Sequence, residues 1–270
     1  WETGFNISFN RNKITDLPQG DDILISGYSL GRVGKPIGIF FAHQALGVYD
    51  RDESNVYYAP DGTIGQYRKG ASTGEVFKGG DMIWADLDGN GVIDDDDRTI
   101  IGDPNPKFIA GLNNRISYKG WSLSANFYWS KGNMVMNELR RRRNQMTYTG
   151  NLGQDALKRW RQQGDVTDFP MIRYGDAMEN FRPSSFSVED GSFIRLKEVI
   201  LSYSIPADYL RGLFVNSINA YVSGTNLLTW SKYSGYDPEV NSSTNPFVQG
   251  VDNGSFPKSR SFNLGIRVQF

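Results

Sequence analysis

Strict alternation of apolar and polar residues is the strongest pattern in the chain. It covers residues 1–9, 121–129 and 262–270, where every second side chain except Thr3 is apolar. In the last segment, Phe262, Leu264, Ile266, Val268 and Phe270 alternate with Asn263, Gly265, Arg267 and Gln269. A period of two over this length predicts strands with one apolar and one polar face.

Three further segments, 108–118, 193–204 and 218–228, follow the same rule less strictly. The middle one changes phase, because the apolar positions before residue 197 and those after it lie on opposite faces. We interpret its first part as packing beneath loops. Together the patterns predict six strands, near 1–13, 107–118, 120–130, 193–205, 214–229 and 259–270.

Short and long connections alternate between these strands. Lys119-Gly120 predicts a tight turn, and 206–213 is also short. The other connections are long, at 14–106, 131–191 and 230–258, and the second has a helical pattern over 155–160. Short periplasmic turns and long extracellular loops are typical of transmembrane barrels. We therefore predict an all-β section of a transmembrane antiparallel β-barrel with long extracellular loops and a periplasmic C-terminus.

Six strands are too few to close such a barrel, which needs about eight. An open edge in lipid leaves backbone groups unpaired, so preceding residues or another chain must complete the wall. The sequence has no secretion signal and no run of about 18 apolar residues. These features predict one section of a longer polypeptide.

Composition narrows the possible functions. The net charge of −1 gives no general attraction for nucleic acid, and the basic run at 139–143 is either a solvated face or a site for an anionic partner. The absence of cysteine excludes thiolate chemistry. We interpret the single histidine, His43, as a loop residue. No nucleophile and base pair is apparent, and carboxylates such as Asp165 and Asp168 lie in polar loops. We expect no enzyme.

The segment 86–97 matches the spacing of an EF-hand calcium loop. Its expected ligands are Asp86, Asp88, Asn90, the Val92 carbonyl, Asp94 and Asp97. Hard oxygen ligands suit Ca²⁺, which would brace a long loop. Asp97 is shorter than the usual glutamate, and no amphipathic helix precedes Asp86. The alternative is an acidic turn whose side chains bond their own backbone.

Loop aromatics are candidates for substrate contact, because a ring fits the C–H face of a sugar. The candidates are Trp84, Tyr148, Trp160, Tyr174 and Trp230. Each is otherwise a packing anchor or a residue of the membrane-interface belt.

Several stretches, in order along the chain, resemble the C-terminal part of SusC/RagA-family TonB-linked outer-membrane proteins. They are 34–38, 97–108, Trp160 with 164–165 and 168–170, 188–197 and the closing strand 261–270. The resemblance implies a barrel of about 22 strands. It also implies an N-terminal plug, which has no counterpart in this chain, and a terminal aromatic, Phe270, that signals assembly.

The same resemblance implies import of glycans or oligopeptides across the outer membrane. It implies contact with membrane lipid, a SusD-like surface lipoprotein over the loops, energy from TonB through the absent N-terminal part, and the remaining barrel and plug of the same protein. The alternative class is a soluble, calcium-braced β-sandwich that binds carbohydrate. An outer-membrane enzyme is a third class, but it lacks a visible nucleophile and base.

Overall fold

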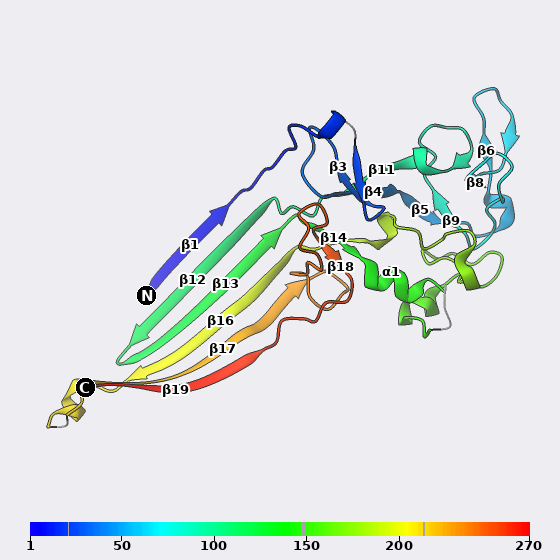
Figure 1. Ribbon diagram of the computed structural model, residues 1–270. Coiled ribbons are helices and arrows are strands. Elements are labelled where there is room, and N and C mark those ends of the chain that lie inside the picture. The colour runs from blue at the N-terminus through cyan, green and yellow to red at the C-terminus, as the bar shows by residue number, and fades with distance from the viewer. Residues whose placement is uncertain (21, 147–149, 213) are drawn as a thin grey trace.

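The computed structural model describes residues 1–20, 22–146, 150–212 and 214–270. Its main feature is a six-stranded sheet in the order β1-β12-β13-β16-β17-β19, in which every neighbouring pair is antiparallel. The strands are β1 (Glu2–Ser8), β12 (Phe108–Tyr118), β13 (Trp121–Lys131), β16 (Phe193–Ser204), β17 (Ser217–Ser231) and β19 (Ser261–Gln269). The predicted section of six antiparallel strands is confirmed (Figure 1).

Strand β1 ends earlier than the predicted 1–13 because Asn12 bonds to loops instead of to β12. Its Oδ1 accepts the Ile37 backbone N–H at 2.7 Å, and its Nδ2 donates to Asn105 Oδ1 at 3.1 Å. The chain therefore leaves the sheet shortly after Ser8.

One face of the sheet is apolar from edge to edge. Residues directly opposite each other in antiparallel strands point to the same side. Leu201 lies opposite both Leu123 and Val222, and Val222 lies opposite Leu264. These side chains are partly or largely exposed, so the face lacks a covering layer. An outward apolar face is what a barrel wall presents to lipid.

The change of phase in β16 is a β-bulge at Lys197. Leu196 pairs with Phe127 and Glu198 pairs with Asn126, so Lys197 is the extra residue. The bulge returns Leu196 to the apolar face shared by Val199. The prediction that the apolar residues before Lys197 lie on the opposite face is wrong, because period counting alone cannot register an inserted residue. The first part of β16 stays paired in the sheet, and its Arg195 is buried against Asp237 and Glu239 of the third connection.

Short and long connections lie at opposite ends of the sheet. The turn between β12 and β13 and the segment carrying η7 (Ala207–Leu210) lie at the end nearer the C-terminus (Figure 1). The three long connections gather at the other end. Lys119, at φ 46°, and Gly120, at φ 85°, form the tighter turn, as two-residue hairpins require.

The long connections are folded. The first contributes a four-stranded sheet in the order β11-β4-β3-β2. The second and third connections join in a sheet in the order β15-β14-β18, and the first connection packs against them in the apolar core beside it. The short strands are β2 (Ile23–Ile25), β3 (Ser29–Gly31), β4 (Ile39–His43), β5 (Ala45–Val48), β6 (Tyr57–Tyr58), β7 (Ile64–Gly65), β8 (Arg68–Lys69), β9 (Met82–Trp84), β10 (Val92–Ile93), β11 (Arg98–Gly102), β14 (Met134–Asn137), β15 (Val188–Asp190) and β18 (Val251–Asp252).

Helical structure is short and confined to connections. The α-helix α1 (Glu138–Asn144) begins where the Asn137 side chain accepts the Arg140 N–H at 2.9 Å. The helix expected at 155–160 is instead a 3₁₀ turn, η4 (Gln154–Lys158), since only short-range hydrogen bonds form there. The other 3₁₀ turns are η1 (Pro18–Gly20), η2 (Asp52–Ser54), η3 (Asp95–Asp97), η5 (Tyr174–Asp176) and η6 (Ser185–Ser187).

Among the described residues, no helix combines the length and the apolar character needed to cross a membrane.

Two apolar cores hold the long connections together. The first joins Phe40 of the first connection, Met136 of the second and Val251 of the third, and all three are fully buried. The second packs Phe77, Met82 and Trp84 of the first connection against Met178 of the second. The loop end is therefore one packed assembly, and it positions the acidic loop 86–97.

Candidate functional site

The acidic loop 86–97 brings three predicted ligands together. One carboxylate oxygen each from Asp86, Asp88 and Asp97 lie within 4.8 Å of one another. Oxygens so arranged fit a hard divalent cation such as Ca²⁺. The same carboxylates also accept backbone N–H groups, such as Gly91 N–H on Asp86 Oδ2 at 2.9 Å, as in an Asx-type turn.

The three other predicted ligands, Asn90, Val92 and Asp94, are held by hydrogen bonds of their own within the loop. Asn90 Oδ1 accepts the Val92 N–H at 2.6 Å, while its Nδ2 donates to Asp88 Oδ2 at 2.7 Å. The Asp94 side chain caps η3 by accepting the Asp96 N–H at 2.9 Å. Val92 is in β10, paired with Arg68 of β8. A cation bound by the three carboxylates therefore requires Asn90 to rotate if it is to contribute an oxygen.

Asp97 is the buried member of the group. Its oxygens accept the N–H groups of Leu87 at 2.7 Å and Asp94 at 3.0 Å. Burial first, and then the nearby Asp86 and Asp88, raise the pKa of Asp97, although these two hydrogen bonds lower it. A bound cation would oppose both effects that raise the pKa.

Glycines allow the loop its shape. Gly91 has φ 75°, and a Cβ there would lie 2.7 Å from the Tyr57 ring. The Tyr57 hydroxyl in turn donates to the Gly89 carbonyl at 2.6 Å. Only glycine combines this backbone conformation with so close an approach.

His43 is in strand β4 and is buried, so its assignment to a loop is wrong. Its Nε2 lies 2.7 Å from the Asp94 carbonyl oxygen. The ring also packs edge-on against Trp84, with centroids 5.9 Å apart. Burial, followed by the neighbouring Arg182, lowers the pKa of His43 to about 4. The neutral ring thus fixes the acidic loop against β4.

Two of the predicted substrate aromatics lie inside the loop assembly. Trp84 is 3% exposed, and the Arg182 guanidinium covers its ring at 5.1 Å. Trp160 is 4% exposed, and its Nε1 donates to the Asp50 carbonyl at 3.0 Å. Both rings are therefore packing anchors in this structure. The sequence could not show this, because a run of loop sequence carries no signal that separates a buried from an exposed tryptophan.

The other aromatics are not gathered into one site. Tyr174 is 70% exposed at the start of η5. Trp230 lies opposite Ile194 near the loop end of the apolar face, where interface aromatics are expected. Tyr148 lies outside the described residues. Phe270 follows β19 and is 81% exposed.

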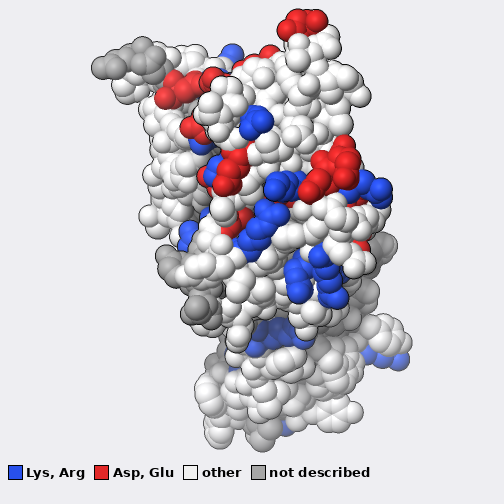
Figure 2. Space-filling model, turned by 90° about the vertical axis from the view of Figure 1, so that its right-hand side faces the viewer, with Lys and Arg blue, Asp and Glu red and all other residues white. Residues whose placement is uncertain are grey.

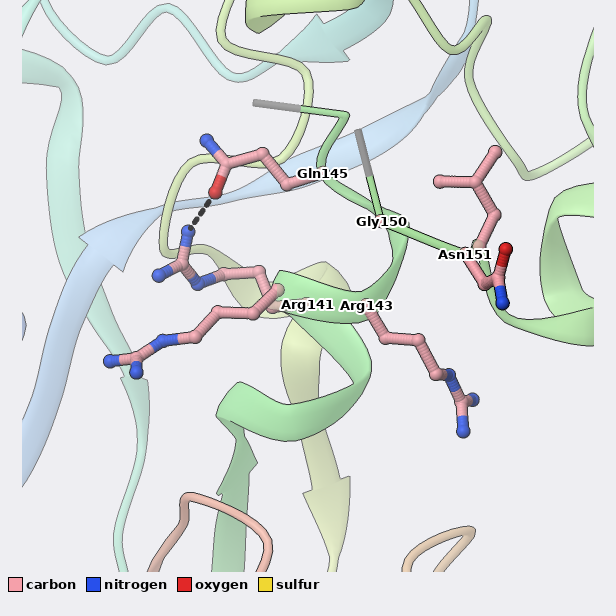
Figure 3. A pocket seen from close by; sticks show the side chains of 7 residues that line it. Arg141, Arg143, Gln145, Gly150 and Asn151 are labelled. Carbon is pink, nitrogen blue, oxygen red and sulfur yellow. Dashed lines mark hydrogen bonds between the residues drawn. The ribbon is translucent and has the colours of Figure 1, made fainter. Parts of the chain in front are cut away.

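The basic run at 139–143 forms most of α1 and is largely paired internally. Arg141 Nε and Nη2 each donate to the buried Glu138 carboxylate at 2.8 Å. Arg140 pairs with Asp155 at 3.1 Å. A pocket of about 570 Å³ opens beside this helix, lined in part by Arg143 and Asn151. Figure 3 shows Arg141 turned toward Gln145 and Arg143 turned away from it.

Acidic and basic side chains are intermixed over the face of the loop end shown in Figure 2. The charges of this face do not form a single-sign field.

Sequence reasoning missed the buried charged group on β16. Arg195 Nη2 donates to Asp237 at 2.5 Å, Nη1 donates to Glu239 at 2.9 Å, and Nε donates to Thr229 at 3.0 Å. Glu239 also pairs with Lys197 and Lys258. An arginine between apolar strand residues was the one available signal, but its partners are distant in sequence.

These features together define the wall and the loop end of a section of a β-barrel. No protein-family model matches the chain. The whole chain is 35% identical over 295 residues to the TonB-dependent receptor P3 of Formosa agariphila, and covers 27% of it. It is 24% identical to the TonB-dependent receptor SusC of Bacteroides thetaiotaomicron, again over its whole length and 24% of the relative.

Solved structures agree with the fold. A structure of the RagAB peptide transporter superposes on 99% of this chain and 26% of its own, with a TM-score of 0.73 and 22% identity. A RagAB peptide importer in an open-open state gives a TM-score of 0.71. The chain thus matches a section of a SusC/RagA-family TonB-dependent receptor, and it spans about a quarter of the length of these relatives. The relatives are receptors rather than enzymes.

Proposed function

We propose that this chain forms part of the wall and extracellular loop assembly of a TonB-dependent importer. The observation that carries the proposal is the match of the whole chain to such receptors. The exposed apolar face and the gathered long connections support it, because they suit a wall in lipid and a ligand-capturing end. The alternative of a soluble sandwich is not favoured, since a sandwich would bury one sheet face against a second sheet.

We further propose that the ligand is a glycan or an oligopeptide and that a SusD-like surface lipoprotein contacts the loop assembly. The chain's likeness to SusC and to RagAB supports both parts. Ligand capture at the loop end would be followed by rearrangement of a plug, driven by TonB from the periplasm. Those steps belong to the remaining barrel and plug of the receptor.

Mass spectrometry of the detergent-purified native assembly tests this proposal. We expect this sequence within a polypeptide of about 110 kDa, because the 30.4-kDa chain spans 27% of its first relative. A co-purifying lipoprotein is expected as well. Growth of the source cells without the receptor on defined oligosaccharides or oligopeptides then identifies the ligand class. A 30.4-kDa protein that stays soluble without detergent would overturn the proposal.

We also propose that Asp86, Asp88 and Asp97 hold a structural Ca²⁺ that braces the first long connection. The support is their convergence within 4.8 Å together with the spacing of the loop. The ion would offset the repulsion among three carboxylates and take no part in ligand capture. Calcium titration of the receptor by calorimetry tests this directly, and an absence of binding contradicts it.

A further inference from the structure

The hollow where β1 and β12 leave the sheet carries a feature that the import proposal does not use. It has a volume of about 520 Å³ and lies at the loop end of the two strands. Its lining residues are Phe9, Asn10, Arg11, Asn12, Lys13, Gly34, Pro36, Asp103, Asn105, Pro106, Lys107 and Phe108. Both strands that form its walls belong to this chain.

The floor of the hollow is aromatic and continues the outward apolar face. Ile7 lies opposite Ala110, which lies opposite Trp129, so all three share that face. Phe9 continues the alternation beyond β1, with its ring 6.1 Å from Phe108. The Phe108 ring lies 5.3 Å from that of Trp129. Aromatic rows at the end of a barrel's apolar band mark the boundary between acyl chains and headgroups.

The rim above this row is basic. Arg11, Lys13 and Lys107 are exposed, and none of them forms an ion pair with any residue that the structure describes. The single carboxylate in the lining, Asp103, is engaged by Asn105, whose backbone N and Nδ2 both donate to its Oδ1. Lys131 lies opposite Phe108 on the same face. With Arg11, Lys13 and Lys107 against the one carboxylate of Asp103, the net charge of the lining is positive.

The rim is also held rigidly. Asn12 bonds to both Ile37 and Asn105, and the Asn105 Nδ2 donates to the Ile37 carbonyl at 2.9 Å. Gly34 N–H donates to the Ile14 carbonyl at 2.8 Å, which fixes the turn that lines the upper wall. Three segments of the chain thus form one built hollow, and its cations do not depend on a free loop for their positions.

We propose that this hollow binds a phosphorylated lipid of the outer leaflet. The phosphate lies among Arg11, Lys13 and Lys107, and the acyl chains pass the aromatic row of Phe9, Phe108 and Trp129 onto the apolar face beyond it. Cations placed just beyond an apolar band attract anionic headgroups, and arginine binds phosphate by paired hydrogen bonds. The inference rests on the proposed place of the strands in the membrane, but it does not depend on what the receptor imports.

Native mass spectrometry of the full-length receptor, purified in detergent and mixed with diphosphoryl lipid A, tests the site. Arg11→Gln with Lys13→Gln should weaken binding by about 10- to 30-fold, from the attraction that each cation contributes at a membrane surface. The matched control is Lys119→Asn with Arg211→Gln, which removes two exposed cations at the opposite end of the sheet. The control should bind as the unchanged receptor does.

Two further arms separate the possible sources of binding. Dephosphorylated lipid A should bind the unchanged receptor much more weakly, which excludes acyl contact alone. Inorganic pyrophosphate should compete poorly, because it lacks acyl chains. Equal binding of the two lipids, equal loss in the control variant, or pyrophosphate as strong as the lipid would each overturn the proposal. Uptake by the same variants reports the importer function separately, because a receptor can fail to bind lipid and still import.

Discussion

Arg195 shows how a single side chain can fix a loop that is far away in sequence. It is 2% exposed, and its guanidinium joins β16 to Asp237 and Glu239 of the third long connection. Removing one partner of a buried ion pair leaves the other charge desolvated and unpaired, which costs about 3–5 kcal/mol. The third connection is therefore held over the sheet by charge as well as by its apolar residues.

Arg195→Met should loosen residues 232–258 selectively. We expect the free energy of local opening to fall by about 3 kcal/mol, because Asp237 and Glu239 lose their shared partner. Hydrogen exchange of the receptor in detergent measures this. Arg211→Met is the control, since Arg211 and Asp208 are both largely exposed and such pairs contribute little. Unchanged exchange in 232–258 would show that the apolar contacts suffice.

The same group predicts how the third connection responds to pH. Burial raises the pKa of Asp237, but hydrogen bonds from Glu239 N–H, Lys258 N–H and Arg195 outweigh it, so the pKa is lowered. Glu239 is also lowered, against burial, by Lys258 and Lys197. A carboxyl whose folded pKa is depressed stabilises the fold above its unfolded pKa of about 4.

Protection of 232–258 should therefore be full at neutral pH and decline as the pH falls below about 4 toward the folded pKa values. Hydrogen exchange corrected for intrinsic rates reports the change. The Arg195→Met receptor should show a smaller decline across the same range. A decline of equal size in the unchanged and the Arg195→Met receptors would show that the pH dependence does not come from the Arg195 ion pairs.

The acidic loop gives a further test at the residue scale. Asp86→Ala with Asp88→Ala should lower the melting temperature of the receptor more when Ca²⁺ is present than in chelator, because the bound ion is then lost in addition to the backbone hydrogen bonds that both side chains accept. Asp96→Asn is the control, since Asp96 lies outside the group of converging carboxylates. Equal melting temperatures of the unchanged receptor with Ca²⁺ and with chelator would show that the loop binds no Ca²⁺.

Residues differed in how far the sequence could predict them. The acidic loop was visible because its members lie within twelve positions and obey a known spacing. The Arg195 group was not, because Asp237 and Glu239 lie in a stretch with no periodicity. Trp84 and Trp160 were candidates for ligand contact until packing placed them in the interior.

Among elements, the six long strands were predictable because each pairs with the next long strand along the chain. The pattern of alternation survives in β13 and β19 without interruption, and in β12 with exceptions only at Ile109 and Asn114. It fails in β16, where Lys197 shifts the phase, and in β17, where Asn226 at φ 53° and its neighbour form the matching irregularity. A bulge follows from the pairing of two strands, so one strand's sequence cannot reveal it.

Phe270 tests the last element. Phe270→Ser should lower the amount of receptor assembled in the outer membrane several-fold while leaving the stability of the assembled barrel nearly unchanged, because the ring is exposed and buries little area. Heat-modified mobility of membrane fractions measures assembly. Phe256→Ser, which removes an even more exposed ring from the third connection, is the control. Equal assembly of the two variants would count against a terminal signal.

At the scale of the whole molecule, the chain divides into a wall and a packed loop end (Figure 1). The wall could be predicted because its order is set by local pairing. The loop end could not, because Phe40, Met136 and Val251 come from three different connections and none belongs to a periodic pattern. Their contact depends on the sheet first bringing the connections to one end.

Phe40→Ala should therefore loosen all three connections together. Removing a fully buried phenylalanine costs about 3–5 kcal/mol, and the cavity borders on residues from each connection. Hydrogen exchange should rise around β4, β14 and β18 by similar factors, with β12 and β13 unaffected. Loosening confined to β4 would show that the connections pack independently.

The shared core also bears on how receptors of this kind diversify. A chimera that took one long connection from a relative and two from this chain would assemble its interior from side chains that were never selected to fit one another. Exchange of all three connections on a retained wall avoids that mismatch. New ligand preferences are then expected to pass between lineages as one inherited block, and single connections are expected to change by slow, paired substitution across the core.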